Sequence, residues 1–469
     1  MNHRSKLVGI LAFSLASLAM PAVAQIVDGS GTAQGSVPVL SGAESNLEPH
    51  VTAWPTVVAQ NTQGMNSQLG ATGPTGPQLE MEPNAAAGPT LVAQPLTDTF
   101  PAKGMPLGGF RLFPTLSLSS AYDDNVFFAQ TATKGDYFFN VTPYARLQSQ
   151  WDRHELDVYA GANLYQYATL STQDRTDWNA GGDGRLDIYQ GVDLSGNGSY
   201  TVSHIANSSP DQPTNAKTPS AFSTTTTNAV LAYHPYHFGF SVGGTFDRYV
   251  YDPTLLVDGS SVSNADRNED QYLVFAKGSY EFSPGYAMFV QANDNNVHYD
   301  LPVGRNSNGY TVNAGLDMLV TDLINGEVFA GYIDQRYLAP FANVSGPNYG
   351  ARVNWSPTPL WTFHLTASRG LNGTIVTNAS TEDDQSVQLA ADFLARPDLI
   401  ASGYVGYLDA NFVGSPLVDT YYTIGLKLNY ALNEWMSAYL SDGYQRRVAS
   451  VAGTNFDDNI VTLGLKFQE

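Results

Sequence analysis

From residue 107 onward, hydrophobic and polar residues alternate in repeated segments of the chain. In 422–430, bulky apolar residues (Tyr, Ile, Leu, Leu, Tyr) alternate with Thr, Gly, Lys and Asn, and 461–467 and 178–188 follow the same rule. Successive side chains of a β-strand point to opposite faces. The pattern therefore predicts a series of strands, each with one apolar and one polar face.

The composition of the polar face distinguishes a membrane barrel from a soluble β-sandwich, which would also alternate. The polar positions are rich in Gly, Asn, Thr, Ser and charges of both signs, segment after segment, whereas the opposite positions are bulky. A wall with lipid outside and water inside has this arrangement. We therefore predict an all-β fold, a transmembrane antiparallel up-and-down β-barrel.

Short turns and longer polar loops alternate between the predicted strands. The short turns are 151–154, 189–191, 234–237, 283–285, 321–323, 356–359, 395–398 and 433–434. The loops are about 123–136, 169–176, 206–220, 252–267, 300–308, 339–347, 371–384, 411–419 and 448–458. Outer-membrane barrels place short turns in the periplasm and long loops outside. Eight turns and nine loops predict 18 strands (16–18), with both barrel ends in the periplasm.

Tryptophan placement supports this assignment. Trp151, Trp355, Trp361 and Trp435 all fall at predicted short turns. Amphipathic aromatic rings favour the level of the lipid headgroups. The short-turn end is therefore expected to carry an aromatic girdle.

The chain before residue 107 has a different character. Residues 1–24 resemble a signal peptide, with basic Arg4 and Lys6, an apolar stretch and a small-residue cleavage site at 22–24. Residues 25–106 are rich in Gly, Pro, Ala, Gln, Ser and Thr and contain almost no aromatic residues. Such a segment has too little apolar bulk to fold alone. We expect a signal peptide (1–24), a disordered, low-complexity periplasmic extension (25–106) and an outer-membrane barrel (107–469).

Charge and motifs restrict the chemistry. The chain has no cysteine and a net charge of -21, which disfavours nucleic acid as a partner. No Gly-x-Ser-x-Gly elbow, His-Glu-x-x-His motif or phosphate-binding loop is present. We therefore expect no enzymatic activity and no catalytic residues.

Charged and aromatic residues on the polar face are candidates for the lining of the lumen. They are Arg146, Asp157, Asp183, Arg185, Asp187, Asp193, Lys277, Asp317, Arg352 and Lys427, with Tyr144, Tyr159, Tyr165 and Tyr404. One interpretation is a constriction that selects solutes by charge and by aromatic stacking. The alternative is that the charges pair across the wall and hold the barrel open.

Two similar acidic triplets suggest a cation site. Asp123-Asp124-Asn125 follows the first strand, and Asp457-Asp458-Asn459 precedes the last. In a closed barrel these strands are neighbours, so oxygen ligands for Ca²⁺ would meet at the seam. The alternative is that Asp and Asn only begin loops through Asx-turns. No other cofactor is expected.

Four local motifs give the sequence a resemblance to a known family. Residues 112–127, 151–154, 280–286 and 355–359 (Leu-Phe-Pro-Thr-Leu-Ser-Leu-Ser-Ser-Ala-Tyr-Asp-Asp-Asn-Val-Phe, Trp-Asp-Arg-His, Tyr-Glu-Phe-Ser-Pro-Gly-Tyr and Trp-Ser-Pro-Thr-Pro) resemble the outer-membrane β-barrel porin type 2 proteins. The resemblance spans about 107–469. Members are commonly associated with exopolysaccharide gene clusters, which implies a part in polysaccharide export.

We therefore expect a bacterial outer-membrane channel for export of polysaccharide or oligosaccharide. The alternatives are a general diffusion porin, or a structural, surface-anchoring barrel without transport. The expected partners are outer-membrane lipid and lipopolysaccharide, the barrel assembly machinery, which would recognise a terminal strand such as 461–467, and periplasmic export components that bind 25–106.

Overall fold

The computed structural model describes residues 100, 102–213, 215–302, 304–321 and 323–469. The predicted signal peptide and residues 25–99 of the predicted extension lie outside the described residues. Within the described part, no helix is long and apolar enough to cross a membrane.

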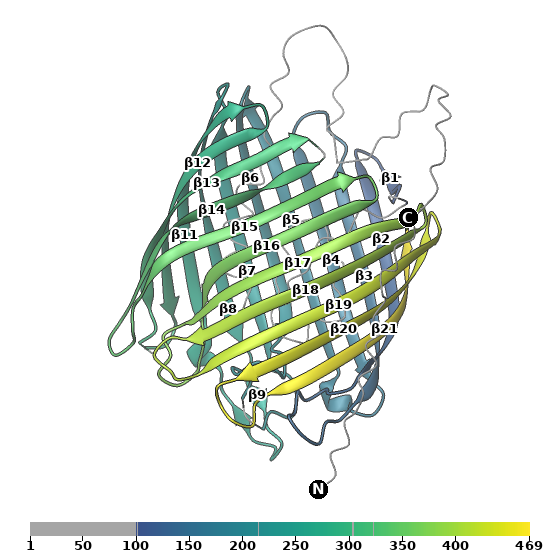
Figure 1. Cartoon of the computed structure of the whole chain (residues 1–469), viewed down its shortest axis with the longest axis vertical. Helices are drawn as coiled ribbons and strands as arrows, with labels where there is room; N and C mark the ends of the chain where they lie inside the picture. The colour runs from purple at the N-terminus through teal and green to yellow at the C-terminus, as the bar shows by residue number, and fades with distance from the viewer. Residues whose placement is uncertain (1–99, 101, 214, 303, 322) are drawn as a thin grey trace, which may run out of the picture. The chain divides into compact units, whose positions relative to one another are not determined.

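Eighteen strands form a closed antiparallel barrel, as predicted (Figure 1). They are β2 Phe110–Asp123, β3 Asp136–Ser149, β4 Glu155–Tyr167, β5 Arg175–Tyr189, β6 Val192–His204, β7 Ala221–Tyr233, β8 Phe238–Tyr251, β11 Glu269–Ser283, β12 Tyr286–Tyr299, β13 Ser307–Thr321, β14 Ile324–Tyr337, β15 Val344–Thr358, β16 Trp361–Asn372, β17 Glu382–Arg396, β18 Leu399–Phe412, β19 Val418–Asn433, β20 Met436–Ala449 and β21 Phe456–Gln468. Each strand pairs with the next along the chain, and β2 pairs with β21 to close the wall.

Small elements accompany the barrel. The strand β1 (Met105–Leu107) pairs with the start of β2, and β9 (Thr254–Leu255) pairs with β10 (Ser261–Val262) within a loop. Of two 3₁₀ turns, η1 (Ser171–Gln173) lies in the loop between β4 and β5, and η2 (Ala265–Arg267) lies in the same loop as β9 and β10. The strand β1 crosses the predicted boundary between extension and barrel.

All eight predicted short turns join consecutive strands, and the nine longer connections lie at the other end. Several turns follow a bulge, as between Glu281 and Ser283. Gly285, in the same turn, has a φ of 79°, which a residue with a Cβ rarely adopts. A short hairpin loop with a bulge and a left-handed glycine is a favoured way to reverse a strand.

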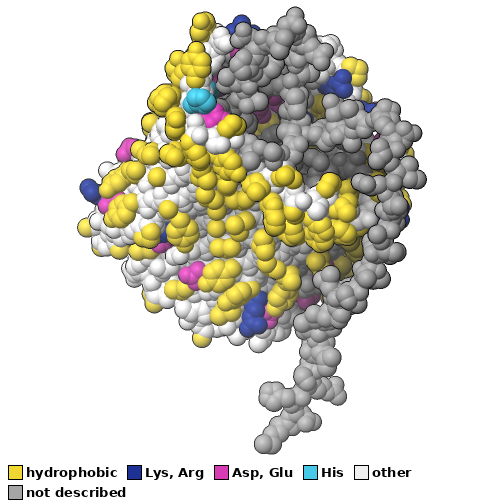
Figure 2. Space-filling model, turned by 45° about the horizontal axis from the view of Figure 1, so that its top comes forward, with side chains coloured by type: hydrophobic (Ala, Val, Ile, Leu, Met, Phe, Trp, Pro, Cys, Tyr) yellow, Lys and Arg dark blue, Asp and Glu magenta, His cyan; other side chains and the backbone are white. Residues whose placement is uncertain are grey.

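The outer wall is apolar, as the alternation predicts. Leu426 on β19 and Leu463 on β21 are each 63 % exposed, whereas the residues directly before and after each of them on its strand point inward. Figure 2 shows hydrophobic side chains covering much of the outer face that it presents. Such exposure is unusual for a soluble protein and is expected for a lipid-facing wall.

The predicted aromatic girdle is present at the short-turn end. Trp151, Trp355, Trp361 and Trp435 are all exposed. Their rings contact other aromatic rings, as where Trp361 stacks on Phe393 with centroids 4.5 Å apart.

The strands of the barrel are 12 to 16 residues long. A tilted strand needs only about 9–11 residues to cross the hydrocarbon core, so the wall extends beyond it.

Candidate functional site

All the candidate lumen residues lie on the inward-facing side of their strands. The inward face alternates with the exposed one along β3, β4, β5, β11, β13, β15 and β19, and these strands carry Arg146, Asp157, Tyr159, Tyr165, Asp183, Arg185, Asp187, Lys277, Asp317, Arg352 and Lys427. Asp193 on β6 also faces inward.

Many of these charges form ion pairs along the wall. Arg146 on β3 pairs with Asp157 on β4. On β5, the Nε atom of Arg185 lies 3.1 Å from a carboxylate oxygen of Asp187. Arg146 and Asp157 are diagonal neighbours on adjacent strands. Arg185 and Asp187 lie two positions apart on one strand and so share its inward face. Pairing lowers the net charge that these residues present to a passing solute.

Lys277 on β11 forms an enclosed pairing with two carboxylates. Its Nζ atom lies 3.0 Å from a carboxylate oxygen of Asp317 on β13 and 2.9 Å from one of Glu327 on β14. The ammonium group also lies 3.8 Å from the centre of the Phe289 ring, and the Lys277 side chain is only 3 % exposed. Glu327, which sequence analysis did not select, is directly opposite Arg352 on β15.

The candidate tyrosines lie against the wall. A Cβ atom added to Gly425 would come within 2.2 Å of the Tyr404 ring, and one added to Gly161 within 2.9 Å of Tyr144. These rings therefore cover glycines of the adjacent strand, as aromatic residues do in designed sheets. Lys427 lies over another ring, that of Tyr439, at 5.1 Å.

Tyr165 is not available for stacking on a solute. It is almost completely buried, and the guanidinium of Arg175 lies 4.1 Å from the centre of its ring. The interpretation that Tyr165 stacks on a solute is therefore contradicted by its burial, although its position on the inward face agrees with prediction.

The loop 205–220, between β6 and β7, enters the mouth of the barrel. Its Asp211 carboxylate accepts hydrogen bonds from the hydroxyl of Thr374 and the backbone N–H of Ile375, at 2.9 and 3.0 Å. Its Ser208 carbonyl accepts one from Arg447 on β20, which also pairs with Asp419. Counted the shorter way around the closed wall, five strands separate β6 from β20 and six separate β7 from β16. These contacts therefore bridge the opening.

Hydrophobic packing reinforces this mouth. Phe128, in the loop after β2, packs against Phe456 on β21 with ring centroids 4.9 Å apart. The same buried cluster includes Phe412 and Tyr421 from the wall and Ala379 from the loop after β16. Residues predicted only as polar loops thus fill part of the lumen. Sequence analysis missed this, because loop residues lack the periodicity that identifies strands.

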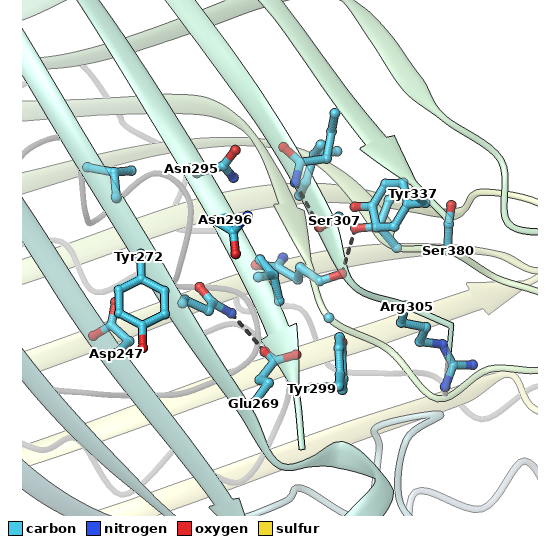
Figure 3. A pocket seen from close by; sticks show the side chains of 18 of the residues that line it. Asp247, Glu269, Tyr272, Asn295, Asn296, Tyr299, Arg305, Ser307, Tyr337 and Ser380 are labelled. Atoms are coloured by element: carbon cyan, nitrogen blue, oxygen red, sulfur yellow. Dashed lines mark hydrogen bonds between the residues drawn. The ribbon is translucent and has the colours of Figure 1, made fainter. Parts of the chain in front are cut away.

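A polar cavity lies beside these loops, at the loop end of β11–β14. Figure 3 shows the side chains that converge on it, including Glu269, Tyr299, Arg305, Ser307 and Tyr337. Most of the lining groups are amides and hydroxyls from neighbouring strands, together with residues 371–373 and 380–381. The strand ends bring these groups together across long sequence distances, so sequence spacing alone gave no signal.

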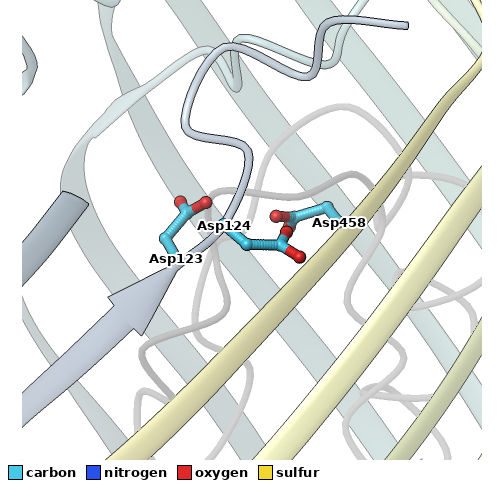
Figure 4. Close-up of side chains that lie close together, drawn as sticks. All are labelled: Asp123, Asp124 and Asp458. Atoms are coloured by element: carbon cyan, nitrogen blue, oxygen red, sulfur yellow. The ribbon is translucent and has the colours of Figure 1, made fainter. Parts of the chain in front are cut away.

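Three of the four aspartates in the two acidic triplets lie close together at the seam between β2 and β21. Ligand atoms of Asp123, Asp124 and Asp458 all lie within 4.8 Å of one another, as Figure 4 illustrates. Asp457 does not join them: it points outward and accepts a hydrogen bond from the Tyr444 hydroxyl at 2.7 Å. The inclusion of Asp457 was therefore wrong, because adjacent residues of a strand face opposite sides.

The seam also contains the predicted turn chemistry. The Asp123 carboxylate accepts a hydrogen bond from the backbone N–H of Asn125 at 2.8 Å, an Asx-turn contact. The Asn125 amide donates to the Asp457 carbonyl at 2.8 Å and so joins the two triplets. Both interpretations of these triplets thus have structural support, and calcium binding stays a prediction.

Comparison with known proteins agrees with this architecture. The family model described as "Putative beta-barrel porin 2" matches residues 98–469. The chain belongs to this family. Membership identifies the chain as a porin-like barrel of the bacterial outer membrane. No curated protein sequence matches it.

Several solved outer-membrane proteins are similar at low sequence identity. Pseudomonas aeruginosa OpdK is 12 % identical, with a TM-score of 0.38, over 76 % of this chain and 99 % of that one. P. aeruginosa OccK2 (OpdF), solved in complex with glucuronate, is 14 % identical, with a TM-score of 0.41, over 77 % and 99 %. Acinetobacter baumannii OccAB4 is 13 % identical, with a TM-score of 0.41, over 78 % and 99 %.

Proposed function

We propose that this porin-like barrel is a selective channel for saccharides and takes part in the export of polysaccharide or oligosaccharide. The observation that carries the proposal is the chemistry of the lumen wall. Charged groups such as Arg146 and Asp157, or Lys277 and Glu327, are paired, so neutral amide, hydroxyl and aromatic groups make up much of the remaining polar surface. Sugars present hydroxyls to such amides and apolar ring faces to tyrosines.

The narrowed mouth also supports a selective channel. A barrel of 18 strands encloses enough space for a water-filled pore. The contacts of Asp211 and Arg447 hold the loop 205–220 across part of that space. A loop inside the lumen reduces the free cross-section, so solutes must contact the wall as they pass.

A general diffusion porin is the second candidate. Pairs such as Arg146 and Asp157 favour it as well, because charges that are paired discriminate weakly between small ions. The two candidates differ in whether saccharides are retained during passage.

Planar-bilayer recording tests the proposal. Purified barrel should form conducting channels whose current is interrupted by added oligosaccharide, more than by a polyethylene glycol of similar mass. Equal effects of sugar and polymer would favour a diffusion porin, and a lack of conductance would favour a structural barrel. In cells, a deletion strain should lose surface polysaccharide while small-solute uptake is retained.

Partners follow from the same proposal. We infer that periplasmic export components bind residues 25–106 and that lipopolysaccharide contacts the outer wall. Pull-down with a peptide of residues 25–106 would test the first inference, with a sequence-scrambled peptide as the control.

A further inference from the structure

The cavity at the loop end of β11–β14 contains a buried carboxylate whose hydrogen bonding is incomplete. Glu269 is 5 % exposed, and its Oε1 atom accepts a hydrogen bond from the Gln271 amide at 2.8 Å. The Tyr299 side chain also interacts with the carboxylate by hydrogen bonding, but Oε2 has no hydrogen bond of ordinary geometry from any described residue. A buried acceptor without a donor costs free energy, about 1–3 kcal/mol in general and more for a charged group. A further donor placed at Oε2 would therefore be favourable.

Space for a donor is available beside Gly373. A Cβ atom built on this glycine would lie 3.3 Å from the Tyr299 hydroxyl and 3.4 and 3.6 Å from the two oxygens of Glu269. The glycine therefore leaves the face of the carboxylate uncovered. Figure 3 shows Glu269 and Tyr299 side by side, with Ser307 and Tyr337 on neighbouring strands.

The remaining lining groups indicate the chemical class of the ligand. They are mostly neutral donors and acceptors: Thr245, Gln271, Asn295, Ser307, Thr311, Gln335, Tyr337, Asn372, Ser380 and Thr381. Asp247 and Arg305 also line the cavity, and both Arg305 and Arg267 interact electrostatically with Glu269. Because the two cations offset the two carboxylates, the cavity favours a neutral ligand with many hydroxyls over a metal ion or an ammonium group.

We propose that this cavity is a binding subsite for one neutral sugar unit, in which a sugar hydroxyl donates to Oε2 of Glu269. The amides and hydroxyls of the lining bind the other hydroxyls of the ring. Arg305 also donates to the carbonyls of Val376 and Ala379, at 3.3 and 3.4 Å, and so links the subsite to the loop after β16. This inference rests on the proposed saccharide channel and locates where the sugar binds.

Single-channel recording on the full-length protein tests the subsite. The probes are maltotriose, cellotriose and raffinose, with polyethylene glycol of similar mass as the non-sugar reference. We expect at least one trisaccharide to produce resolved current blocks. Glu269→Gln should weaken its binding about tenfold or more, as expected for the loss of one hydrogen bond to a charged group. Gly373→Leu should abolish the blocks, because its side chain would fill the space beside the carboxylate.

Two matched variants control for general effects. Glu434→Gln makes the same chemical change at an exposed short turn. Gly278→Leu makes the same steric change at a strand position with open space around it. Both should bind sugar as the wild type does. Heat-modifiable gel migration, which reports an intact barrel, verifies that every variant is folded.

The outcomes separate this inference from the proposed function. If no trisaccharide blocks the wild-type channel, the saccharide channel itself is wrong. If sugars block the wild type and both cavity variants equally, the channel stands and the subsite is wrong. If Glu269→Gln changes only the cation-to-anion selectivity, the carboxylate binds cations and the sugar assignment is overturned.

Discussion

Asp211, in the loop between β6 and β7, accepts a 2.9 Å hydrogen bond from the hydroxyl of Thr374, in the loop between β16 and β17. Both residues are buried. Because the two loops join distant strands of the wall, this contact ties them together over the opening. The size of the pore therefore depends on the loops as well as on the number of strands.

Removing this contact should enlarge the channel. For Asp211→Ala we expect a higher single-channel conductance and a loss of about 1–3 kcal/mol of stability, typical when buried hydrogen-bond partners lose their acceptor. Bilayer recording and urea unfolding in detergent measure the two effects. Asp258→Ala, at an exposed position of the next loop, is the control and should change neither. Unchanged conductance in Asp211→Ala would show that the loop does not limit the pore.

The two faces of β19 should respond differently to a charge. Leu426 faces outward and Thr423 faces inward. We expect Leu426→Arg to cost about 2–4 kcal/mol, the range for arginine at the bilayer midplane, and Thr423→Arg to cost much less. Unfolding in lipid vesicles measures both. Equal costs would contradict the assignment of the lipid-facing side.

Calcium binding at the seam remains a prediction that a chelator can test. If Asp123, Asp124 and Asp458 bind Ca²⁺, added calcium should raise the thermal stability of the barrel and EDTA should lower it. The response should disappear in Asp124→Ala combined with Asp458→Ala. Asp457→Ala is the matched control, since its carboxylate points away from the cluster. A wild-type barrel that is indifferent to EDTA would leave only the Asx-turn interpretation.

The Arg248–Asp300 pair should give a small acid dependence of stability. Arg248 donates hydrogen bonds to both carboxylate oxygens of Asp300 and lowers its pKa below the ordinary value of 3.8. A lowered pKa stabilises the folded state above about pH 4, and this stabilisation is lost as the pH falls through the lowered pKa. Because the pair is partly exposed, we expect less than about 1 kcal/mol.

The measurement compares wild type with Asp300→Asn at pH 6 and at pH 3. The wild type should be the more stable at pH 6, and the difference should shrink at pH 3. Asp252→Asn, an exposed carboxylate nearby, should show no such change. A difference that grows toward pH 3 would have the wrong sign for this pair.

The sequence predicted the wall well because the wall is governed by local rules. Turn residues such as Gly285 and the alternation along β19 each depend on neighbouring positions, so strand number and facing direction could be derived. The same rule of alternation, applied strictly, would have excluded Asp457 from the seam. Its neighbour Asp458 is inward, so Asp457 must be outward.

The interior of the mouth could not be predicted in the same way. The contacts of Asp211 with Thr374, and of Arg447 with Ser208, join residues 163 and 239 positions apart. Their geometry depends on barrel tilt and stagger, which alternation does not report. The Glu269 cavity could not be predicted from the sequence for the same reason, since its lining comes from six strands and two loop segments.

Closure of the wall through β2 and β21 has a consequence for biogenesis. Residues at this seam, such as Asn125 and Asp457, are 332 positions apart. During synthesis, β2 emerges long before its partner exists, so its free edge could pair with another chain in the meantime. The nascent protein is therefore expected to need a holding factor until β21 arrives, and chains interrupted before this strand are expected to aggregate or be degraded.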